Sequence, residues 1–297
     1  MSKQNIPVFV CSDENYAPFV AITALSICSN TSEKIDLYVI DCGIKDGTKN
    51  KVEQITQICS NLNIHWLALS LEEYFSDFIA LGHISKAAYG RFLIPHLKTD
   101  LKKVIYSDID VIYCGDISEL YRQDLNGMAL GAVPGLDRKS TSKVAASLKR
   151  LGLSQNHIYF ESGLLLIDSD QWRAKGITNK LFETEKKIRD RLLYVDQDIL
   201  NYYFECNYCP LNEKFSVTSP RAKKFIDWRG RLEDCTMRHF EGPRKPWLVH
   251  PLWPERFKSN NIGKNLFWHY ARMTPFYQEL IQRFPIYAKL VNWGILK

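Results

Sequence analysis

The chain has 297 residues, a formal net charge of +6 and a hydrophobic content of 45%. These values are typical of a soluble globular protein with a large core, arranged as one big domain or as one and a half. No apolar run approaches the roughly 18 residues of a membrane-spanning helix, and the apolar run Ile6–Cys11 is too short for a signal peptide. We therefore expect a cytoplasmic protein whose eight scattered cysteines are free thiols.

The N-terminal part of the chain alternates between strand and helix patterns. Short apolar runs predict strands over Ile6–Cys11, Ile35–Ile40 and Ile64–Leu69, and apolar residues at helical spacing predict helices over Tyr16–Ser29 and Asp46–Ser60. This alternation is typical of a parallel sheet covered by helices. Because such sheets bind ligands at the carboxyl ends of their strands, the polar residues that follow these strands are candidates for a site.

The rest of the chain continues the α/β pattern without repeats or low-complexity stretches. We expect a helix over Ser85–Leu97, strands within Ile105–Ile112, Ala129–Val133, Leu164–Ile167 and Thr236–Phe240, and helices over residues 170–189 and 195–204. Neither G-x-x-x-x-G-K-[ST] nor G-x-G-x-x-G occurs, so ATPase and dinucleotide-binding functions lack their phosphate loops. Phosphate binding would then depend on a metal and on basic side chains.

The most informative stretch is an apolar strand that ends in two carboxylates one residue apart, Asp108 and Asp110. Residues two apart on an extended chain point the same way, and carboxylates held that close repel each other unless a cation lies between them. Hard oxygen ligands suit Mg²⁺ or Mn²⁺, which also bind phosphate oxygens. The stretch predicts a metal–diphosphate site, although a single Asp-x-Asp pair also occurs in turns and helix caps.

The segment from Pro251 to Lys297 is basic and rich in aromatic residues, with seven basic side chains against two acidic ones. Two interpretations stay open for it. It can lie peripherally on an anionic membrane surface, or it can form a helix that packs its aromatic residues on the main domain. Nucleic-acid binding is not expected, because the chain has no basic helix and no RNA-binding aromatic motif.

Six motifs follow one another in a specific order: Val8–Tyr16, Tyr89–Phe92, Tyr106–Asp110, Tyr159–Ile167, Asp196–Asn201 and His239–Trp247. In this order they resemble glycosyltransferase family eight, especially the bacterial lipooligosaccharide galactosyltransferases, over residues 6–250. The resemblance implies an α/β fold of the GT-A, Rossmann-like type over residues 1–250, with a central, mainly parallel sheet flanked by helices. Residues 251–297 would form a helical C-terminal extension.

The resemblance also implies a retaining, metal-dependent transferase. It would move a hexose, galactose or glucose, from a UDP-hexose donor to a sugar hydroxyl on an oligosaccharide or glycolipid acceptor, such as lipooligosaccharide, at the inner face of the plasma membrane. Asp108, Asp110 and His239 would ligate Mn²⁺, with Mg²⁺ as the alternative, because carboxylates and imidazole suit these ions. The alternatives are a self-glucosylating primer protein, a non-catalytic sugar-nucleotide-binding module and a metal-dependent phosphohydrolase.

The family pattern further implies a set of donor-binding residues: Cys11, Asp13, Asn15, Arg91, Ile109, Ser162, Gly242 and Lys245. Asp13 and Asn15 would lie under the uracil and ribose, near the Cys11 backbone, and Arg91 would reach the donor sugar or the diphosphate. Gly242 would let backbone approach phosphate, and Lys245 would supply a positive charge to the leaving diphosphate.

The catalytic candidates are Asp196, Gln197 and Glu161. Asp196 would accept hydrogen bonds from sugar hydroxyls, and Gln197 would lie near the anomeric carbon. Since an amide oxygen is a weak nucleophile, we favour same-face attack, with Gln197 positioning or stabilising the cationic sugar. Glu161 stands where the family usually has Asn, and an ionised Glu can only accept hydrogen bonds. Its role is open between a changed contact to a donor hydroxyl and a nucleophile.

Overall fold

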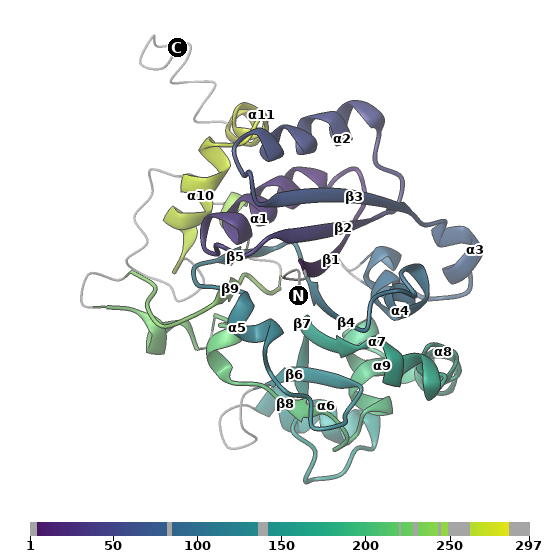
Figure 1. Ribbon diagram of the computed structural model, residues 1–297. Coiled ribbons are helices and arrows are strands. Elements are labelled where there is room, and N and C mark those ends of the chain that lie inside the picture. Colours follow the sequence, from purple (N-terminus) through teal and green to yellow (C-terminus); the bar gives the residue numbers. More distant parts are fainter. Residues whose placement is uncertain are drawn as a thin grey trace.

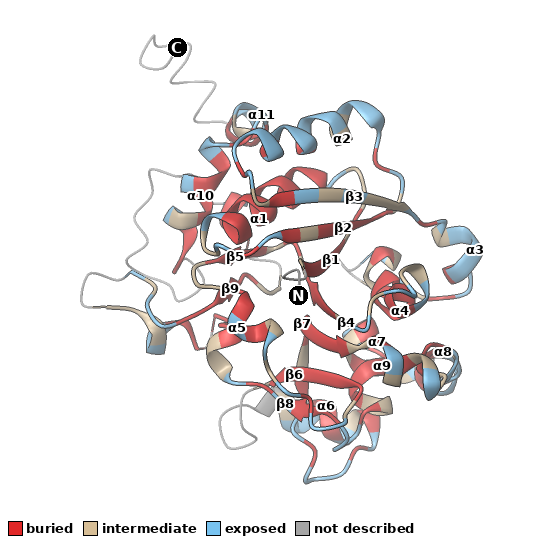
Figure 2. Cartoon of the chain, in the orientation of Figure 1, coloured by how far each residue is buried: buried red, intermediate tan, exposed pale blue. Residues whose placement is uncertain are grey.

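The protein is built around one central sheet, with helices on both faces (Figure 1). The computed structural model describes residues 5–81, 85–135, 142–219, 221–227, 231–242, 245–248 and 262–284. In these residues the sheet has seven strands in the order β3-β2-β1-β4-β7-β6-β8. Its inner strands are almost wholly buried, whereas the edge strand β3 and the helices α2 and α3 expose much of their surface (Figure 2).

The N-terminal half of the sheet is parallel. Its strands are β1 (Ile6–Ser12), β2 (Ile35–Asp41) and β3 (Leu62–Ala68), connected through α1 (Ala17–Ser29) and through α2 (Asp46–Glu53) with the 3₁₀ turn η1 (Gln54–Gln57). The predicted strands and helices of this region are confirmed, with ends that coincide or are shifted by up to seven residues. All but one of the thirteen residues of α1 are buried, which explains its nearly continuous apolar sequence.

The second half of the sheet brings in an antiparallel strand. β4 (Lys103–Ser107) pairs in parallel with β1, and β7 (Phe160–Asp168) runs antiparallel between β4 and β6 (Leu130–Pro134). β8 (Cys209–Pro210) completes the sheet beside β6. The prediction of a central, mainly parallel sheet flanked by helices is confirmed. Because β7 runs the other way, its beginning lies at the edge where β1 and β4 end.

Several shorter helices surround this sheet. They are α3 (Leu71–Phe75), η2 (Lys86–Leu93), α4 (Ile94–Leu97), α5 (Ser118–Tyr121), α6 (Ser142–Leu151), α7 (Ser169–Ala174), α8 (Ile177–Ile188), η3 (Arg189–Arg191), α9 (Val195–Tyr203), η4 (Glu213–Phe215), η5 (Ala222–Phe225) and η6 (Pro246–Leu248). The helix expected over Ser85–Leu97 is mainly 3₁₀. The helix expected over 170–189 is divided into α7 and α8 at Gly176, whose φ is +60°.

A small second sheet pairs β5 (Val111–Tyr113) with β9 (Met237–His239) in antiparallel register, Val111 opposite His239. The strand predicted within Ile105–Ile112 is therefore two strands, β4 and β5, with Asp108 and Asp110 between them. The strand predicted over Thr236–Phe240 exists, but it belongs to this small sheet and not to the central one. The small sheet brings together segments that are more than a hundred residues apart in the sequence.

The described part of the C-terminal segment packs on the main domain through α10 (Lys264–Arg272) and α11 (Tyr277–Gln282). The ring of Trp247 stacks on Phe19 of α1 with centroids 3.8 Å apart, and the buried Phe267 of α10 lies beside both. The packing interpretation is therefore confirmed for residues 262–284. Residues 251–261 and 285–297 lie outside the described part, so the membrane contact and the domain boundary at 250 stay predictions.

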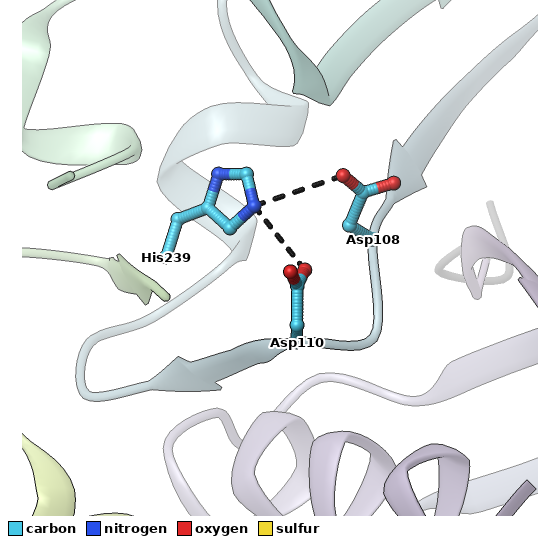
Figure 3. A group of neighbouring side chains, drawn as sticks. All are labelled: Asp108, Asp110 and His239. Carbon is cyan, nitrogen blue, oxygen red and sulfur yellow. Dashed lines mark ion pairs between the residues drawn. The ribbon is translucent and has the colours of Figure 1, made fainter. Parts of the chain in front are cut away.

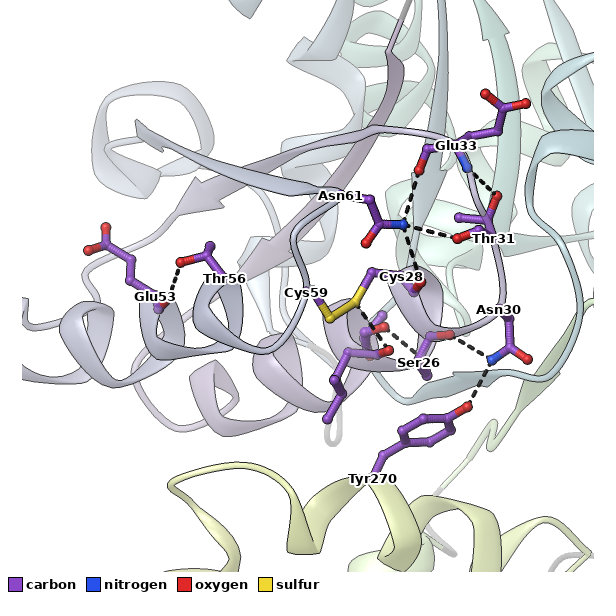
Figure 4. The surroundings of a disulfide bond; sticks show 12 residues. Ser26, Cys28, Asn30, Thr31, Glu33, Glu53, Thr56, Cys59, Asn61 and Tyr270 are labelled. Atoms are coloured by element: carbon purple, nitrogen blue, oxygen red, sulfur yellow. Dashed lines mark hydrogen bonds between the residues drawn. A yellow bond between two sulfur atoms is a disulfide. The ribbon is translucent and has the colours of Figure 1, made fainter.

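Among the described residues, no helix is both long and apolar enough to cross a membrane. One pair of cysteines is not in the expected free thiol state. Cys28 at the end of α1 and Cys59 before β3 form a disulfide (Figure 4), so the prediction that all eight cysteines are free thiols is wrong. The nearby Asn61 side chain donates to the carbonyls of Cys28, Thr31 and Glu33, which fastens the same two segments together.

Candidate active site and metal centre

A cavity of about 630 Å³ opens at the edge where β1 and β4 end and β7 begins. Most of the predicted site residues line it: Cys11, Asp13, Arg91, Asp108, Ile109, Asp110, Glu161, Ser162, Asp196, Gln197, His239, Gly242 and Lys245. Asn15 lies in the same turn as Asp13, but it is exposed and is not among the lining residues. The cavity is large enough to hold a drug-sized or cofactor-sized ligand.

Asp108, Asp110 and His239 converge on one point of the cavity (Figure 3). His239 Nε2 lies 3.2 Å from Asp110 Oδ1 and 3.7 Å from Asp108 Oδ2, and one ligand atom from each residue lies within 4.8 Å of the others. Backbone hydrogen bonds hold this arrangement, from Asp108 N to Gly163 O and from Phe240 N to Asp110 O. Two carboxylates and an imidazole form a donor set that suits Mn²⁺ or Mg²⁺.

The Asp108 carboxylate is oriented by two donors to the same oxygen. Oδ1 accepts from the Tyr106 hydroxyl at 2.6 Å and from Arg91 Nη2 at 3.0 Å. The Arg91 guanidinium also lies over the Tyr106 ring, 4.3 Å from its centroid. Oδ2 is left facing His239, so the carboxylate offers one oxygen to a metal and keeps the other for the protein.

The charges around Asp110 hold it in the ionised form. Burial alone would raise the pKa of Asp110, but the neighbouring Lys245 and His239 outweigh burial and hold that pKa well below its usual range. Burial alone would lower the pKa of His239, but the ion pair with Asp110 raises it well above its usual value. The Lys245 ammonium contacts Asp110 Oδ2 and donates to the Phe240 carbonyl. A divalent cation would therefore enter a site in which Asp110 is already ionised.

Gly163 makes room for the imidazole of His239. A Cβ at position 163 would lie 2.4 Å from His239 Cε1 and 2.9 Å from both His239 Nδ1 and Asp108 Oδ2. No side chain larger than hydrogen fits there without moving two of the three candidate ligands. A metal would fit this structure, because close packing aims Nε2 of His239 at the two carboxylates, and that nitrogen would bind the ion once its proton is lost.

The other end of the Arg91 guanidinium contacts two further candidate residues, Asp196 and Ser162. Its Nη1 lies 3.0 Å from Asp196 Oδ2 and donates to the Ser162 carbonyl, and the Ser162 hydroxyl donates to Asp196 at 2.9 Å. Burial raises the pKa of Asp196 to about 6, although Arg91 opposes the shift. Arg91 is thus the bridge between the metal carboxylate Asp108 and Asp196, and it is itself buried.

The side chain of Gln197 is held in one orientation. Its Oε1 accepts from the Ser162 backbone N–H at 3.1 Å, and its Nε2 donates to the Tyr159 hydroxyl at 3.3 Å. The Tyr159 hydroxyl in turn donates to Asp198 at 2.7 Å, and Asp198 pairs with Arg150 of α6. Because an N–H can only donate, this network fixes which end of the amide is oxygen.

Glu161 lines the cavity, and its carboxylate also lies next to Nδ1 of the His239 imidazole. Its Oε2 accepts from the buried Ser216 hydroxyl at 3.3 Å and lies 3.9 Å from His239 Nδ1. Nδ1 itself is buried, and it has no hydrogen-bond partner within the described structure. Glu161 therefore both lines the cavity and lies next to the candidate metal ligand His239.

Four tyrosines of the cavity wall were not among the predicted site residues: Tyr16, Tyr106, Tyr159 and Tyr194. Tyr106 and Tyr159 each begin one of the six motifs, close to predicted site residues. A tyrosine hydroxyl beside those polar residues was the signal that could have identified them. Tyr16 closes the turn after β1, where its N–H donates to Asp13 Oδ1 at 3.1 Å.

Three comparisons place these features among known proteins. The model of the family described as "Glycosyl transferase family 8" matches residues 7–250. General stress protein A of Bacillus subtilis is 31% identical, covering 85% of this chain and 94% of that protein. The lipopolysaccharide 1,2-glucosyltransferase of Escherichia coli K12 is 25% identical, covering 82% and 72%. The structure of the galactosyltransferase LgtC with donor and acceptor sugar analogs superposes with a TM-score of 0.76 at 26% identity, over 91% and 96% of the two chains.

Proposed function

This chain belongs to glycosyl transferase family 8, and on that premise we propose that it moves a hexose from a UDP-sugar to a sugar hydroxyl of a bacterial surface glycan. Its fold is of the GT-A type, and it is related to lipopolysaccharide glycosyltransferases. The proposed donor sugar is galactose or glucose, and the proposed acceptor is an oligosaccharide or a glycolipid such as lipooligosaccharide. We place the reaction in the cytoplasm, with a peripheral membrane contact through residues 251–297.

One observation carries this proposal, which is the convergence of Asp108, Asp110 and His239 within 4.8 Å beside a buried arginine and a buried lysine. Carboxylates and imidazole are the ligands that Mn²⁺ accepts in proteins. When bound, such an ion would offset the negative charge of a diphosphate. Lys245 would add its ammonium on the same side, moving from Asp110 to a phosphate oxygen of the leaving group.

The remaining residues support transfer with retention of the anomeric configuration. The bond between the anomeric carbon and the phosphate oxygen breaks while the acceptor hydroxyl attacks from the same face, and its proton passes to the phosphate oxygen that leaves. Gln197 would present a fixed amide to the cationic sugar. Asp196 would accept hydrogen bonds from sugar hydroxyls, and Asp13 would contact the nucleoside.

The test is binding and turnover of a panel of nucleotide sugars, with and without Mn²⁺, by the wild type and Asp110→Ala. We expect one UDP-hexose to bind and turn over slowly with Mn²⁺ alone, and the variant to lose both. Asp170→Ala is the matched control, because Asp170 belongs to another Asp-x-Asp pair and is more than half exposed beside Arg173. Binding of no UDP-sugar would contradict the proposal.

The same panel separates the alternatives. A phosphohydrolase would consume the sugar nucleotide rapidly without any acceptor. A self-glucosylating protein would gain the mass of a hexose, which intact-protein mass spectrometry detects. Binding without turnover, even with a panel of oligosaccharide acceptors, would indicate a sugar-nucleotide-binding module.

A further inference from the structure

We propose that Glu161 is a positioning residue for the metal ligand His239: its carboxylate accepts a hydrogen bond from Nδ1–H and so directs the Nε2 lone pair at the metal. This inference rests on the metal-binding part of the proposed function. It gives Glu161 a role different from the sugar contact or the nucleophile expected from the sequence. It also explains why this chain has Glu where the family usually has Asn.

The first step is the state of the imidazole. A neutral imidazole has one N–H and one lone pair. In this structure Nε2 faces Asp110 Oδ1 at 3.2 Å and Asp108 Oδ2 at 3.7 Å, so Nε2 is the nitrogen that would bind a metal. When Nε2 binds a metal, the one remaining proton of the ring is on Nδ1, which is buried and has no hydrogen-bond partner within the described structure. A buried N–H of this kind needs an acceptor.

The second step is the choice of acceptor. Glu161 Oε2 lies 3.9 Å from Nδ1, and the same oxygen accepts a hydrogen bond from the Ser216 hydroxyl at 3.3 Å. A shift of about 1 Å brings Oε2 to hydrogen-bond length from Nδ1. The ring cannot turn away from this partner, because Gly163 packs against its Cε1 and Nδ1 so closely that even a Cβ would clash.

The third step is the effect on the metal. A carboxylate on the far nitrogen of a ligating imidazole fixes its tautomer, fixes its orientation and makes it a stronger donor, and removal of such a partner weakens metal binding about 10- to 100-fold. An Asn side chain is one methylene shorter and uncharged, so it reaches less far toward Nδ1 and polarises the imidazole less. With Glu at position 161, we therefore expect the site to bind its metal tightly even when no donor is bound.

The experiment measures Mn²⁺ affinity of the donor-free protein, by the electron paramagnetic resonance signal of free Mn²⁺ at one fixed pH. We expect Glu161→Gln to bind Mn²⁺ about tenfold more weakly than the wild type, since Gln keeps the length and an acceptor oxygen but loses the charge, and Glu161→Leu to bind more weakly still. Glu161→Asn gives a second, shorter variant if Leu does not fold. Thermal melts establish that each variant is folded.

The matched control is Glu241→Gln. Glu241 lines the same cavity, but its carboxylate accepts from Ser219, so the variant removes an equal charge without touching Nδ1. It should bind Mn²⁺ within threefold of the wild type. If Glu161→Gln also stays within threefold, or if Glu241→Gln weakens binding equally, the positioning role is overturned.

Binding of UDP and of UDP-hexose, each with saturating Mn²⁺, separates this role from a sugar contact. A residue that touches only the sugar would change the affinity for UDP-hexose and leave Mn²⁺ binding intact, which would contradict the inference. The proposed function can fail independently. If Mn²⁺ binding depends on Glu161 but no UDP-sugar binds, the positioning role stands and the transferase function does not.

Discussion

Tyr106 donates its phenolic hydroxyl to Oδ1 of Asp108 at 2.6 Å, and both residues belong to the stretch that first indicated a metal site. Arg91 donates to the same oxygen. The two donors leave the second oxygen of Asp108 directed at His239, so the metal geometry depends on a phenol and a guanidinium as well as on the ligands.

Removal of the phenol should therefore loosen the metal site. We expect Tyr106→Phe to weaken Mn²⁺ binding by about tenfold, because Asp108 would keep a single donor on Oδ1 and could rotate. Titration of the donor-free protein with Mn²⁺ measures this. Tyr121→Phe is the control, since its hydroxyl makes one long contact to the Lys103 carbonyl away from the cavity. An unchanged affinity in Tyr106→Phe would show that Arg91 alone orients Asp108.

A methyl group at position 163 should eliminate metal binding. Gly163→Ala would force the His239 ring and Asp108 Oδ2 apart, and we expect at least a hundredfold loss of Mn²⁺ affinity together with loss of transferase activity. Gly47→Ala tests the general effect of such a change, because nothing lies within 4 Å of its added Cβ in α2. That control should be as stable as the wild type or slightly more so. A fully active Gly163→Ala would contradict the packing argument.

Removal of the Lys245 ammonium should strengthen Mn²⁺ binding but slow the turnover of the sugar nucleotide. Its ammonium contacts Asp110 Oδ2, so without donor it competes with a cation for that oxygen. We expect Lys245→Met to bind Mn²⁺ about threefold or more tightly, and to turn over UDP-hexose at least a hundredfold more slowly, because the leaving diphosphate loses a positive charge. Lys214→Met, which breaks a half-exposed pair with Glu119, should change neither quantity. Weaker Mn²⁺ binding in Lys245→Met would show that the lysine supports the site instead of competing.

Loss of the hydrogen bond from Gln197 to Tyr159 should lower kcat only through the orientation of the Gln197 amide. Tyr159→Phe is expected to lower kcat by about tenfold with little change in KM, because the amide loses the partner that fixes its orientation. Gln197→Ala should lower kcat further, and the double variant should be no slower than Gln197→Ala. Steady-state kinetics of the four proteins form the cycle, and additive losses would separate the two residues.

Asp196 should make the free energy of unfolding fall as the pH rises, which is the reverse of the usual effect of a carboxylate. Burial raises its pKa to about 6 in the folded protein, so the folded state binds this proton more tightly than the unfolded state does. The resulting stabilisation is complete below about pH 4 and is lost as the pH rises to about 6, by up to about 3 kcal/mol for a shift of this size.

Urea unfolding of the metal-free wild type and Asp196→Asn at pH 4, 5, 6 and 7 measures this change. The stability of the wild type relative to the variant should fall between pH 4 and 6 and then stay constant. A difference that is flat across the series would mean that Arg91 keeps Asp196 ionised at every pH tested.

The simple periodicities of buried strands and of amphipathic or apolar helices were sufficient to predict six of the seven strands of the central sheet, but not the two-residue strand β8. Ile6–Ser12 and Ile35–Asp41 were found almost to the residue for this reason. The pairing of β5 with β9 could not be predicted, because it joins two three-residue strands across a long sequence separation. The disulfide between Cys28 and Cys59 was missed because the compartment argument says nothing about which thiols meet.

The candidate site was predictable as a set of residues but not as a set of contacts. Asp108 and Asp110 were expected to face one way because they are two apart on a strand, yet they lie in the turn between β4 and β5 and converge through backbone bonds to Gly163 and Phe240. The pairing of Arg91 with both Asp108 and Asp196 depends on three separate segments meeting, which no local pattern encodes.

The packed rings of Trp247, Phe19 and Phe267 also limit where the chain can be shortened without exposing its core. The family match ends at residue 250, which invites a shortened expression clone that stops there. Such a clone would keep Phe19 and Trp247 but lose Phe267 and the Tyr270 hydroxyl that accepts from Asn30, uncovering apolar surface along α1. Crystallisation and assay work on this enzyme should therefore retain at least α10 and α11.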